Sequence, residues 1–346
     1  MPDKNYNFTG QKSVVTFGEI MMRLSPQGNN RLIQTDNLNI TYGGGEANVS
    51  LSLAYLGVQA RHVTCFPDND LGRAAAAFYR KYGVGTEAMV YQGNRLGLYF
   101  LEVGAGIRPS KVVYDRKDSA FAKLKPEWFD WKEILKNTTW FHWTGISPAI
   151  SASAAQACRE AILTAKELGI IVSADVNYRR NLWQYGKTVQ EIMPDMVAGC
   201  DIVVCTEGDA EDIFGILPRK EEPDSFISVS GQLMQRFPNI KKVIATQRET
   251  LSASHNKLSG ILFDGTKMLK TPTYEINPIV DRIGGGDAFM AGYIYGTLHY
   301  KDDQQAITFA TAASALKHTI NGDINLATVA EIEEIVKGNT SGRLLR

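Results

Sequence analysis

The chain carries no excess charge, because its 346 residues include 37 lysines and arginines against 37 aspartates and glutamates. Its formal net charge of +0 gives no overall field that would attract nucleic acid or an anionic membrane surface. The sequence has no run of 18 apolar residues, which a membrane-spanning helix requires, and residues 1–7 lack the apolar core of a secretory signal. We therefore expect a cytoplasmic protein that binds neither nucleic acid nor membrane.

Cysteine and histidine are scarce and carry no metal-binding or redox pattern. No Cys-x-x-Cys pair occurs, so we expect buried free thiols in a reducing compartment at all four cysteines, Cys65, Cys158, Cys200 and Cys205. The five histidines show no metal-ligand spacing. His142 stands between Phe141 and Trp143 in an apolar run, and we predict that it is a packed core residue.

Several well-known nucleotide-binding signatures are also missing. A Rossmann oxidoreductase needs Gly-x-Gly-x-x-Gly after its first strand, and no such segment follows the first predicted strand. Gly186-Lys187-Thr188 would end a P-loop, but Asn181 replaces the first glycine of that motif. The motif set of protein kinases is absent as well. A phosphate site in this chain must therefore be built from other segments.

Apolar, β-branched runs alternate with helical patterns along most of the chain. Strands are predicted at residues 13–24, 61–66, 139–145, 170–175, 201–205 and 241–246. Helices are predicted at residues 48–56, 72–82, 152–168, 287–299, 303–319 and 328–337. This alternation is typical of a parallel sheet covered on both faces by helices, so we expect an α/β fold.

One region breaks the alternation. Residues 96–103 and 111–116 form two strand-like runs with no helix between them, and Gly104, Gly106 and Pro109 supply a turn. A hairpin inserted into an α/β chain usually stands outside the main sheet. We expect one α/β domain over residues 1–346, with a small lid of strands inserted from about residues 20–42 and 90–117.

Three consecutive glycines, Gly284, Gly285 and Gly286, lead into the predicted helix at residues 287–299. Backbone without Cβ atoms can approach a ligand closely, and the free N–H groups and positive dipole end of a helix start favour an anion such as phosphate. Asp287 stands beside this anion site and can accept a hydroxyl proton during phosphoryl transfer. Its place at a helix start predicts a low pKa. The alternative is a tight loop in which Asp287 only complements the helix dipole.

A second glycine run opens the predicted helix near residue 48. Residues 43–48 read Gly-Gly-x-x-x-Asn, and Gly57 and Asp70-Leu71-Gly72 follow, whereas residues 281–287 read Asp-x-x-Gly-x-Gly-Asp. In these two ordered motifs the chain resembles the ribokinase-like (PfkB) carbohydrate kinases over roughly residues 14–319. The resemblance implies a ribokinase-like three-layer α/β/α fold, Mg²⁺ and ATP as cofactors, and a homo-oligomer, such as a dimer paired through the lid strands. It assigns Asp287 as general base and the three glycines as anion hole.

Within this family the likeness is strongest to kinases of 2-keto-3-deoxygluconate. It is carried by Gly-Leu-Tyr at residues 97–99, Val-Tyr-Asp-Arg at 113–116, Gly-Ile-Ser-Pro at 145–148 and Asp-Val-Asn-Tyr-Arg at 175–179. The resemblance implies ATP-dependent phosphorylation of the 6-hydroxyl group of this sugar acid. It implies a substrate pocket that includes Gly44, Asn48, Tyr99, Tyr114, Arg116, Ile146 and Arg179.

The two arginines give this substrate some independent physical support. A guanidinium group binds a carboxylate well, whereas a pocket for a neutral sugar gains little from an uncompensated arginine. Arg116 ends a predicted lid strand, and Arg179 follows a predicted sheet strand at the end where α/β ligands bind. The alternative is that both arginines form surface ion pairs.

Some segments depart from the family pattern. Gly285 replaces the usual alanine, and Arg282 replaces a small or β-branched residue, where it can contact a phosphate or pair with Asp281. Residues 246–252 are predicted as the nucleotide loop, although they contain no glycine. The resemblance assigns nucleotide binding to Thr246, Arg248, Ala310 and Thr311. It assigns metal binding to Asp281 and, where Thr206-Glu207-Gly208-Asp209 replaces the family's Asn-x-x-Glu, to Asp209.

Two other functions remain open from the sequence. One is a kinase of the same family for a neutral sugar such as fructose or ribose, for which Arg179 would matter less. The other is a catalytically weak regulator that binds sugar or nucleotide, because folds host many functions. The retained Asp287 argues against the regulator.

Overall fold

The computed structural model describes residues 12–342 of the chain. The strands of its main sheet are β1 (Ser13–Phe17), β4 (Gln59–Val63), β9 (Trp140–Thr144), β10 (Ile171–Asp175), β11 (Ile202–Val204), β12 (Lys242–Ser252), β13 (His255–Phe263), β14 (Met268–Lys270) and β15 (Tyr274–Ile276). Their order is β14-β13-β12-β11-β10-β9-β1-β4, and β15 also pairs with β13. Neighbours from β4 to β12 are parallel, whereas β13 pairs antiparallel with β12, β14 and β15. The prediction of a mostly parallel α/β sheet is confirmed.

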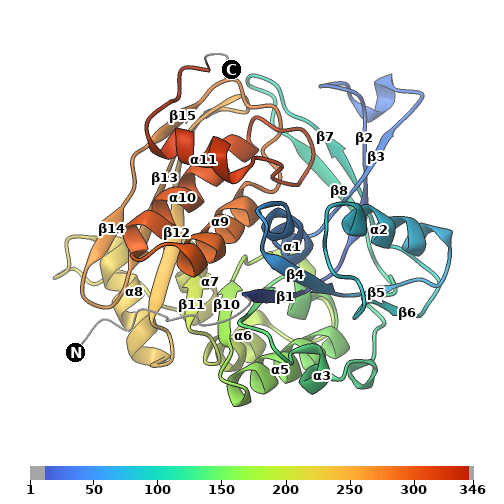
Figure 1. The fold of residues 1–346 in the computed structure, drawn as a ribbon, viewed down its shortest axis with the longest axis horizontal. Helices are drawn as coiled ribbons and strands as arrows, with labels where there is room; N and C mark the ends of the chain where they lie inside the picture. Colours follow the sequence, from blue (N-terminus) through green and yellow to red (C-terminus); the bar gives the residue numbers. More distant parts are fainter. Residues whose placement is uncertain (1–11, 343–346) are drawn as a thin grey trace.

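Helices cover both faces of this sheet (Figure 1). One face carries α1 (Gly45–Tyr55), α9 (Gly285–His299) and α10 (Asp303–Lys317), and the other carries α5 (Ala152–Glu167), α6 (Val189–Val197), α7 (Glu207–Phe214) and α8 (Ser225–Arg236). Further helical segments are α2 (Asp70–Lys81), α3 (Trp131–Ile134), α4 (Ser147–Ile150), α11 (Val329–Val336), η1 (Leu32–Gln34), η2 (Pro126–Trp128) and η3 (Arg180–Leu182). The arrangement is the expected α/β/α sandwich.

Alternation along the central strands divides the core into two parts. Successive side chains of a strand point to opposite faces of its sheet. Val14 and Trp140 pack with α1, α9 and α10, whereas their neighbours Val15 and Phe141 pack with α5 to α8. Because both faces are buried, these strands read in the sequence as continuous apolar runs.

A second sheet stands apart from the first at the upper right of Figure 1. It contains β2 (Met21–Ser25), β3 (Asn39–Gly43), β7 (Leu98–Glu102) and β8 (Lys111–Asp115), in the order β3-β2-β7-β8. We call these four strands the lid. A short parallel pair, β5 (Cys65–Phe66) and β6 (Val90–Tyr91), lies beside α2. The residues expected to supply lid strands, about 20–42 and 90–117, contain these four strands except for Gly43, the last residue of β3.

Three predictions about strands were wrong. Residues 61–66 do not form one strand, because residues 61–63 belong to β4 of the main sheet and Cys65–Phe66 form β5, which pairs with β6 in a different sheet. Residues 13–24 form two strands in different sheets, β1 and β2, because the chain leaves the main sheet at Gly18 and enters the lid at Met21. Residues 246–252 are not a loop, since β12 continues to Ser252 in a long hairpin with β13. A regular strand needs no glycine, which explains why this segment lacks one.

The four cysteines and His142 are buried, as the sequence predicts. No helix within residues 12–342 is long and apolar enough to span a membrane. All four cysteines are buried and free, and His142 is fully buried, with its Nδ1 atom 2.9 Å from the Ser173 hydroxyl oxygen. Burial lowers the pKa of His142 to about 3, so this side chain is a neutral core residue.

Candidate functional site

The candidate site lies where the carboxyl ends of the parallel strands meet the amino ends of two helices. Glu19 follows β1, Thr144 ends β9 and Asp175 ends β10. Helices α1 and α9 both begin at this edge of the sheet and share one core cluster. Open α/β sheets bind ligands at this edge, because the loops and helix starts converge there.

We call Gly284, Gly285 and Gly286, at the start of α9, the glycine turn. Its first residue has a backbone conformation that only glycine adopts without strain. Gly284 caps the helix in the left-handed region at φ 79°, and a Cβ atom there would collide with the carbonyl oxygen of Asp323. Gly286 is exposed, and a Cβ atom there would meet nothing within 4 Å. The N–H groups of this first turn have no acceptor within the helix, so the turn can hold an anion.

Asp287 stands in the first turn of α9 and faces α1. Its carboxylate accepts a hydrogen bond of 2.7 Å from the Asn48 amide, and its side chain stays partly exposed. Surrounding protein atoms raise the pKa of Asp287 to about 8, and the hydrogen bond from Asn48 opposes this rise. The prediction of a low pKa was therefore wrong, because desolvation outweighs the effect of the helix start.

Other carboxyl groups add to this effect. The charges of Asp175, Asp323 and Glu46 all raise the pKa of Asp287. Burial also raises the pKa of Asp175 to about 7, with a further rise from Asp209, whereas the charge of Arg179 lowers it. A group of carboxyl groups with raised pKa values at the end of a sheet is typical of a proton-transfer site.

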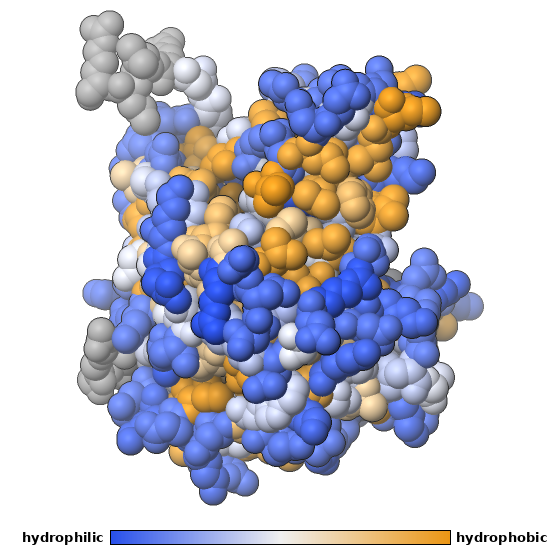
Figure 2. All heavy atoms as spheres, turned by 90° about the vertical axis from the view of Figure 1, so that its right-hand side faces the viewer, coloured by the Kyte–Doolittle hydropathy of each residue, from blue (hydrophilic) through white to orange (hydrophobic). Residues whose placement is uncertain are grey.

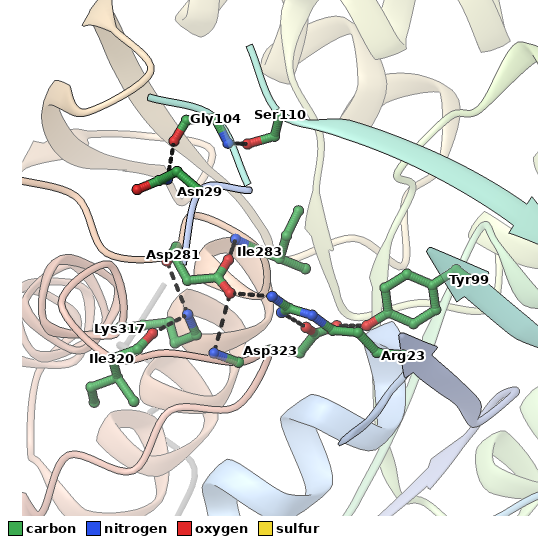
Figure 3. Close-up of polar contacts among 11 residues, drawn as sticks. Arg23, Asn29, Tyr99, Gly104, Ser110, Asp281, Ile283, Lys317, Ile320 and Asp323 are labelled. Carbon is green, nitrogen blue, oxygen red and sulfur yellow. Dashed lines mark hydrogen bonds and ion pairs between the residues drawn. The ribbon is translucent and has the colours of Figure 1, made fainter. Parts of the chain in front are cut away.

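A buried cluster of charged residues lies next to the glycine turn (Figure 3). Its members are Arg23, Asp281, Lys317 and Asp323. Arg23 of the lid strand β2 is 1% exposed and donates to the carboxylates of Asp281, at 2.6 Å, and Asp323. The Tyr99 hydroxyl of lid strand β7 also donates to Asp323. Lys317 of α10 donates to the backbone carbonyl of Asp281. The lid, the glycine turn and α10 therefore meet in one cluster of charges.

The two arginines predicted for the substrate pocket have different surroundings. Arg116 donates through its Nε atom, at 2.8 Å, and its Nη2 atom to the Glu19 carboxylate, and both side chains are largely buried. Arg179 is exposed at the start of η3, and its charge reaches the carboxyl group of Asp175. Arg116 thus forms an ion pair, as in the alternative interpretation of the two arginines, but the pair is largely buried rather than on the surface. Arg179 instead lies close enough to Asp175 for its charge to act on that carboxyl group.

This geometry can be set against known proteins. A sequence model of the pfkB family of carbohydrate kinases matches residues 11–329. The chain belongs to the pfkB family of carbohydrate kinases. The predicted family and the predicted kinase activity are both confirmed.

Similar proteins of this family cover nearly the whole chain. A crystal structure of 2-dehydro-3-deoxygluconokinase from Thermotoga maritima is 42% identical with a TM-score of 0.90, and the match covers 96% of this chain and 100% of that one. A PfkB family carbohydrate kinase from Listeria grayi is 36% identical with a TM-score of 0.88, over 94% and 100% of the two chains. A 2-dehydro-3-deoxygalactonokinase from Haloferax volcanii is 28% identical, over 95% and 98%.

The residues expected to bind nucleotide in this pfkB kinase fall into two groups. Thr246 and Arg248 lie on β12. Burial lowers the pKa of Arg248, and the positive charge of Arg282, which precedes the glycine turn, lowers it further. Ala310 and Thr311 are fully buried in α10, where Thr311 donates to the Ile307 carbonyl at 2.8 Å. This burial argues against an adenine-binding wall at Ala310 and Thr311.

The two carboxylates expected to bind metal both have other partners. Asp281 pairs with Arg23, and Asp209 accepts from the backbone N–H group and hydroxyl group of Thr206 at the start of α7. No group of three or more His, Cys, Asp or Glu side chains within residues 12–342 is arranged to hold a metal ion.

The remaining predicted pocket residues lie around the same edge. Gly44 caps α1 where a Cβ atom would collide with the Glu19 carbonyl, and Ile146 caps α4 and is partly buried. Tyr99 is 4% exposed, whereas Tyr114 is 55% exposed, and their ring centroids are 6.1 Å apart. The Tyr99 hydroxyl donates a hydrogen bond to Asp323, so it is already occupied. Tyr114 is therefore the exposed aromatic side chain of this pair.

Sequence reasoning missed Arg23, Asp323 and Lys317. A cavity of about 590 Å³ lies between the lid and residues 278–280 and 321–322, with Arg23 in its wall. Asp287, Asn48 and the three glycines do not line it, so it does not coincide with the predicted anion site. The only hint in the sequence was charge within apolar runs, such as Arg23 in Met21-Met22-Arg23-Leu24.

Proposed function

We propose that this enzyme transfers the γ-phosphoryl group of ATP to the 6-hydroxyl group of 2-keto-3-deoxygluconate. One observation carries the proposal: Asp287, held by Asn48, stands directly after the open glycine turn of α9. The names of the similar kinases from Thermotoga maritima and Haloferax volcanii support a 2-keto-3-deoxy sugar acid as substrate. We expect the reaction to occur in the cytoplasm, where ATP is available.

Asp287 is the general base in this proposal. The oxygen of the 6-hydroxyl group forms a bond to the γ-phosphorus, the bond from that phosphorus to the bridging oxygen of ADP breaks, and the hydroxyl proton moves to Asp287. A carboxylate with a pKa of about 8 is a stronger base than an ordinary aspartate. The N–H groups of Gly284, Gly285 and Gly286 stabilise the charge on the transferred group.

Mg²⁺, when bound to ATP, would neutralise charge on the nucleotide phosphates. Arg248 and Arg282 support a polyphosphate beside the turn, because two guanidinium groups repel each other unless an anion lies between them. Thr246 precedes Arg248 by two residues on β12 and so faces the same side of the hairpin. We assign these three residues to the nucleotide.

Arg179 is the residue that we assign to the carboxylate of the sugar acid. Its charge reaches Asp175, and the charge of Asp175 reaches Asp287, so the three groups lie within one electrostatic neighbourhood. Arg116 is neutralised by Glu19, so in our proposal it orients the lid strand β8 beside the pocket. Tyr114, Ile146, Gly44 and Asn48 would complete the pocket.

The experiment is ADP release from Mg-ATP with 2-keto-3-deoxygluconate, its galactonate epimer, gluconate, fructose, ribose and adenosine. We expect strong turnover only with the keto-deoxy acids. Turnover with fructose or ribose instead would support the neutral-sugar kinase. Absence of turnover across the panel, with nucleotide or sugar still bound, would support the regulator.

The variant Arg179→Ala separates the sugar-acid enzyme from the neutral-sugar enzyme. Loss of one charged hydrogen-bonding partner should reduce kcat/KM for the sugar acid by roughly 10- to 100-fold. Arg180→Ala is the matched control, because Arg180 is also exposed and its nearest carboxylate, Asp212, is 3.9 Å away. Equal effects of the two substitutions would contradict the assignment of Arg179.

We also propose a homodimer that pairs through the lid. Figure 2 shows apolar side chains gathered on the face that the lid occupies, and Ile40 of β3 and Val113 of β8 are both more than two-fifths exposed. β3 and β8 are the edge strands of the lid, and open edges invite pairing with another chain. Light scattering of the protein should give twice the mass of the chain, whereas Val113→Lys should reduce that mass.

A further inference from the structure

Lys317 is a buried lysine whose ammonium group contacts backbone rather than a carboxylate. It is 0% exposed, and its Nζ atom donates to the carbonyl oxygens of Asp281 and Ile320, each at 3.1 Å (Figure 3). Burying an ammonium group is costly unless neighbouring groups compensate it. Burial lowers the pKa of Lys317, and the charges of Asp281 and Asp323 oppose that change.

The two carbonyls belong to the two segments that shape the anion hole. Asp281 begins the turn that leads into Gly284, and its carboxylate also accepts from the N–H group of Ile283 at 3.0 Å. Ile320 begins the segment that leads to Asp323, whose carbonyl oxygen lies against Gly284. The ammonium group of Lys317 therefore links the segment that begins at Asp281 to the segment that begins at Ile320.

Arg23 completes the same cluster from the lid. The carboxylates of Asp323 and Asp281 outweigh the effect of burial and raise the pKa of Arg23. Two cations, Arg23 and Lys317, thus balance two carboxylates, Asp281 and Asp323. A charge-balanced buried cluster holds its shape, because removal of one member leaves an uncompensated charge.

We propose that Lys317 is a positioning residue that supplies a built-in cation to the glycine turn, so that the turn needs no small cation from solution. Its ammonium group holds the carbonyls of Asp281 and Ile320 in the arrangement that directs the N–H groups of the turn toward phosphate. This role rests on the proposed function, because phosphate must bind at residues 284–286. A misplacement of about 1 Å at such a site costs roughly 100-fold in rate.

The test compares Lys317→Ala, which opens a space lined by two carbonyls, with Lys317→Met, which fills that space without charge. Thermal midpoint, Mg-ADP binding and kcat are measured in ammonium, potassium or tetramethylammonium chloride at equal ionic strength. Lys301→Ala is the matched control, because Lys301 is an exposed lysine just before α10. The wild type and the control should behave alike in all three salts.

We expect Lys317→Ala to lose about 100-fold in kcat, with little change in the KM for sugar. Ammonium or potassium should restore at least about one tenth of the wild-type kcat and should raise the thermal midpoint of this variant, because a small cation replaces the lost ammonium group. Lys317→Met should show neither response. The thermal midpoint and Mg-ADP binding do not depend on which sugar is the substrate, so they test the cation role even if the proposed sugar is wrong.

Two results would overturn the inference. The first is a folded Lys317→Ala enzyme whose kcat and Mg-ADP affinity lie within about two-fold of the wild type in tetramethylammonium. The second is equal recovery of Lys317→Ala in all three salts, or recovery of Lys317→Met by ammonium, because either shows an effect of salt in general rather than of a bound cation.

Discussion

Glu46 and Asp287 occupy matching places in the molecule but have different surroundings. Each lies in the first turn of a helix that begins at a glycine, and the two helices, α1 and α9, share one core cluster. Glu46 is 1% exposed, and its Oε1 atom accepts from the N–H and hydroxyl groups of Thr144 and from the Ser147 hydroxyl, at 3.1, 2.9 and 2.6 Å. Within residues 12–342, Asp287 receives a side-chain hydrogen bond only from Asn48.

If Asp287 is the base, as we propose, the difference separates a structural acid from a reactive one. Three donors saturate one oxygen of Glu46 and fix it in place, whereas Asp287 is partly exposed and accepts a side-chain hydrogen bond through one oxygen, from Asn48. Burial raises the pKa of both groups. A raised pKa alone therefore does not identify a general base. A candidate base must have a raised pKa and must also be accessible to the substrate.

The largest expected effect comes from Asp287→Asn. Loss of the general base should reduce kcat about 10³-fold while the KM for sugar changes little. ADP release measures both quantities. Asp70→Asn is the control, because Asp70 also lies in the first turn of a helix, on the exposed side of α2. A variant at Asp287 with near-wild-type kcat would contradict the assignment.

Glu46→Ala should act on stability rather than on the chemical step. The substitution leaves the N–H and hydroxyl groups of Thr144 without an acceptor and leaves the Ser147 hydroxyl only the Phe17 carbonyl, 3.5 Å away, at a cost of about 3 kcal/mol in the free energy of unfolding. Urea denaturation measures the change, and Glu46→Gln, which keeps an acceptor oxygen, should cost less. If the folded Glu46→Ala protein lost as much kcat as Asp287→Asn, the contrast between the two acids would fail.

Asp175→Asn should change the pH dependence of the reaction. In the wild type, kcat/KM should rise as pH increases through about 8, because Asp287 must lose its proton to act as base. The negative charge of Asp175 is one cause of that raised pKa, so its removal should move the rise to lower pH. A profile that stays in place would show that Asp175 does not influence Asp287.

Asn48→Ala should produce a smaller shift in the opposite direction. The Asn48 amide stabilises the ionised form of Asp287, so its removal should raise the pKa further and move the rise in kcat/KM to higher pH. Ser50→Ala serves as control, because Ser50 lies buried on the same helix and makes no hydrogen bond within the described structure. Shifts in the same direction for Asn48→Ala and Asp175→Asn would contradict this electrostatic account.

Local patterns in the sequence were sufficient for the parts of the site that one segment builds by itself. The glycine turn and Asp287 are adjacent in sequence, and a helix start gives them their arrangement whatever surrounds them. The β/α alternation predicted the sandwich for the same reason, since each strand carries its own periodicity. The strand boundary at Gly18 was missed, because an apolar run does not reveal that the chain changes sheets.

Contacts between distant segments were beyond the reach of those patterns. Arg23 meets Asp281 and Asp323 from positions 258 and 300 residues away, and no local rule predicts that a lid strand carries a buried arginine. The pKa of Asp287 was misjudged for a related reason, because desolvation depends on what packs around the helix start. The partner of Arg116 likewise lies 97 residues away, at Glu19.

The most direct test is identification of the product formed from Mg-ATP and 2-keto-3-deoxygluconate. Phosphorus and carbon NMR should detect one phosphomonoester at carbon 6 for each ADP released by the wild type, and almost none with Asp287→Asn. Release of ADP with inorganic phosphate alone, or a phosphomonoester on a neutral sugar but not on the keto-deoxy acid, would contradict the account.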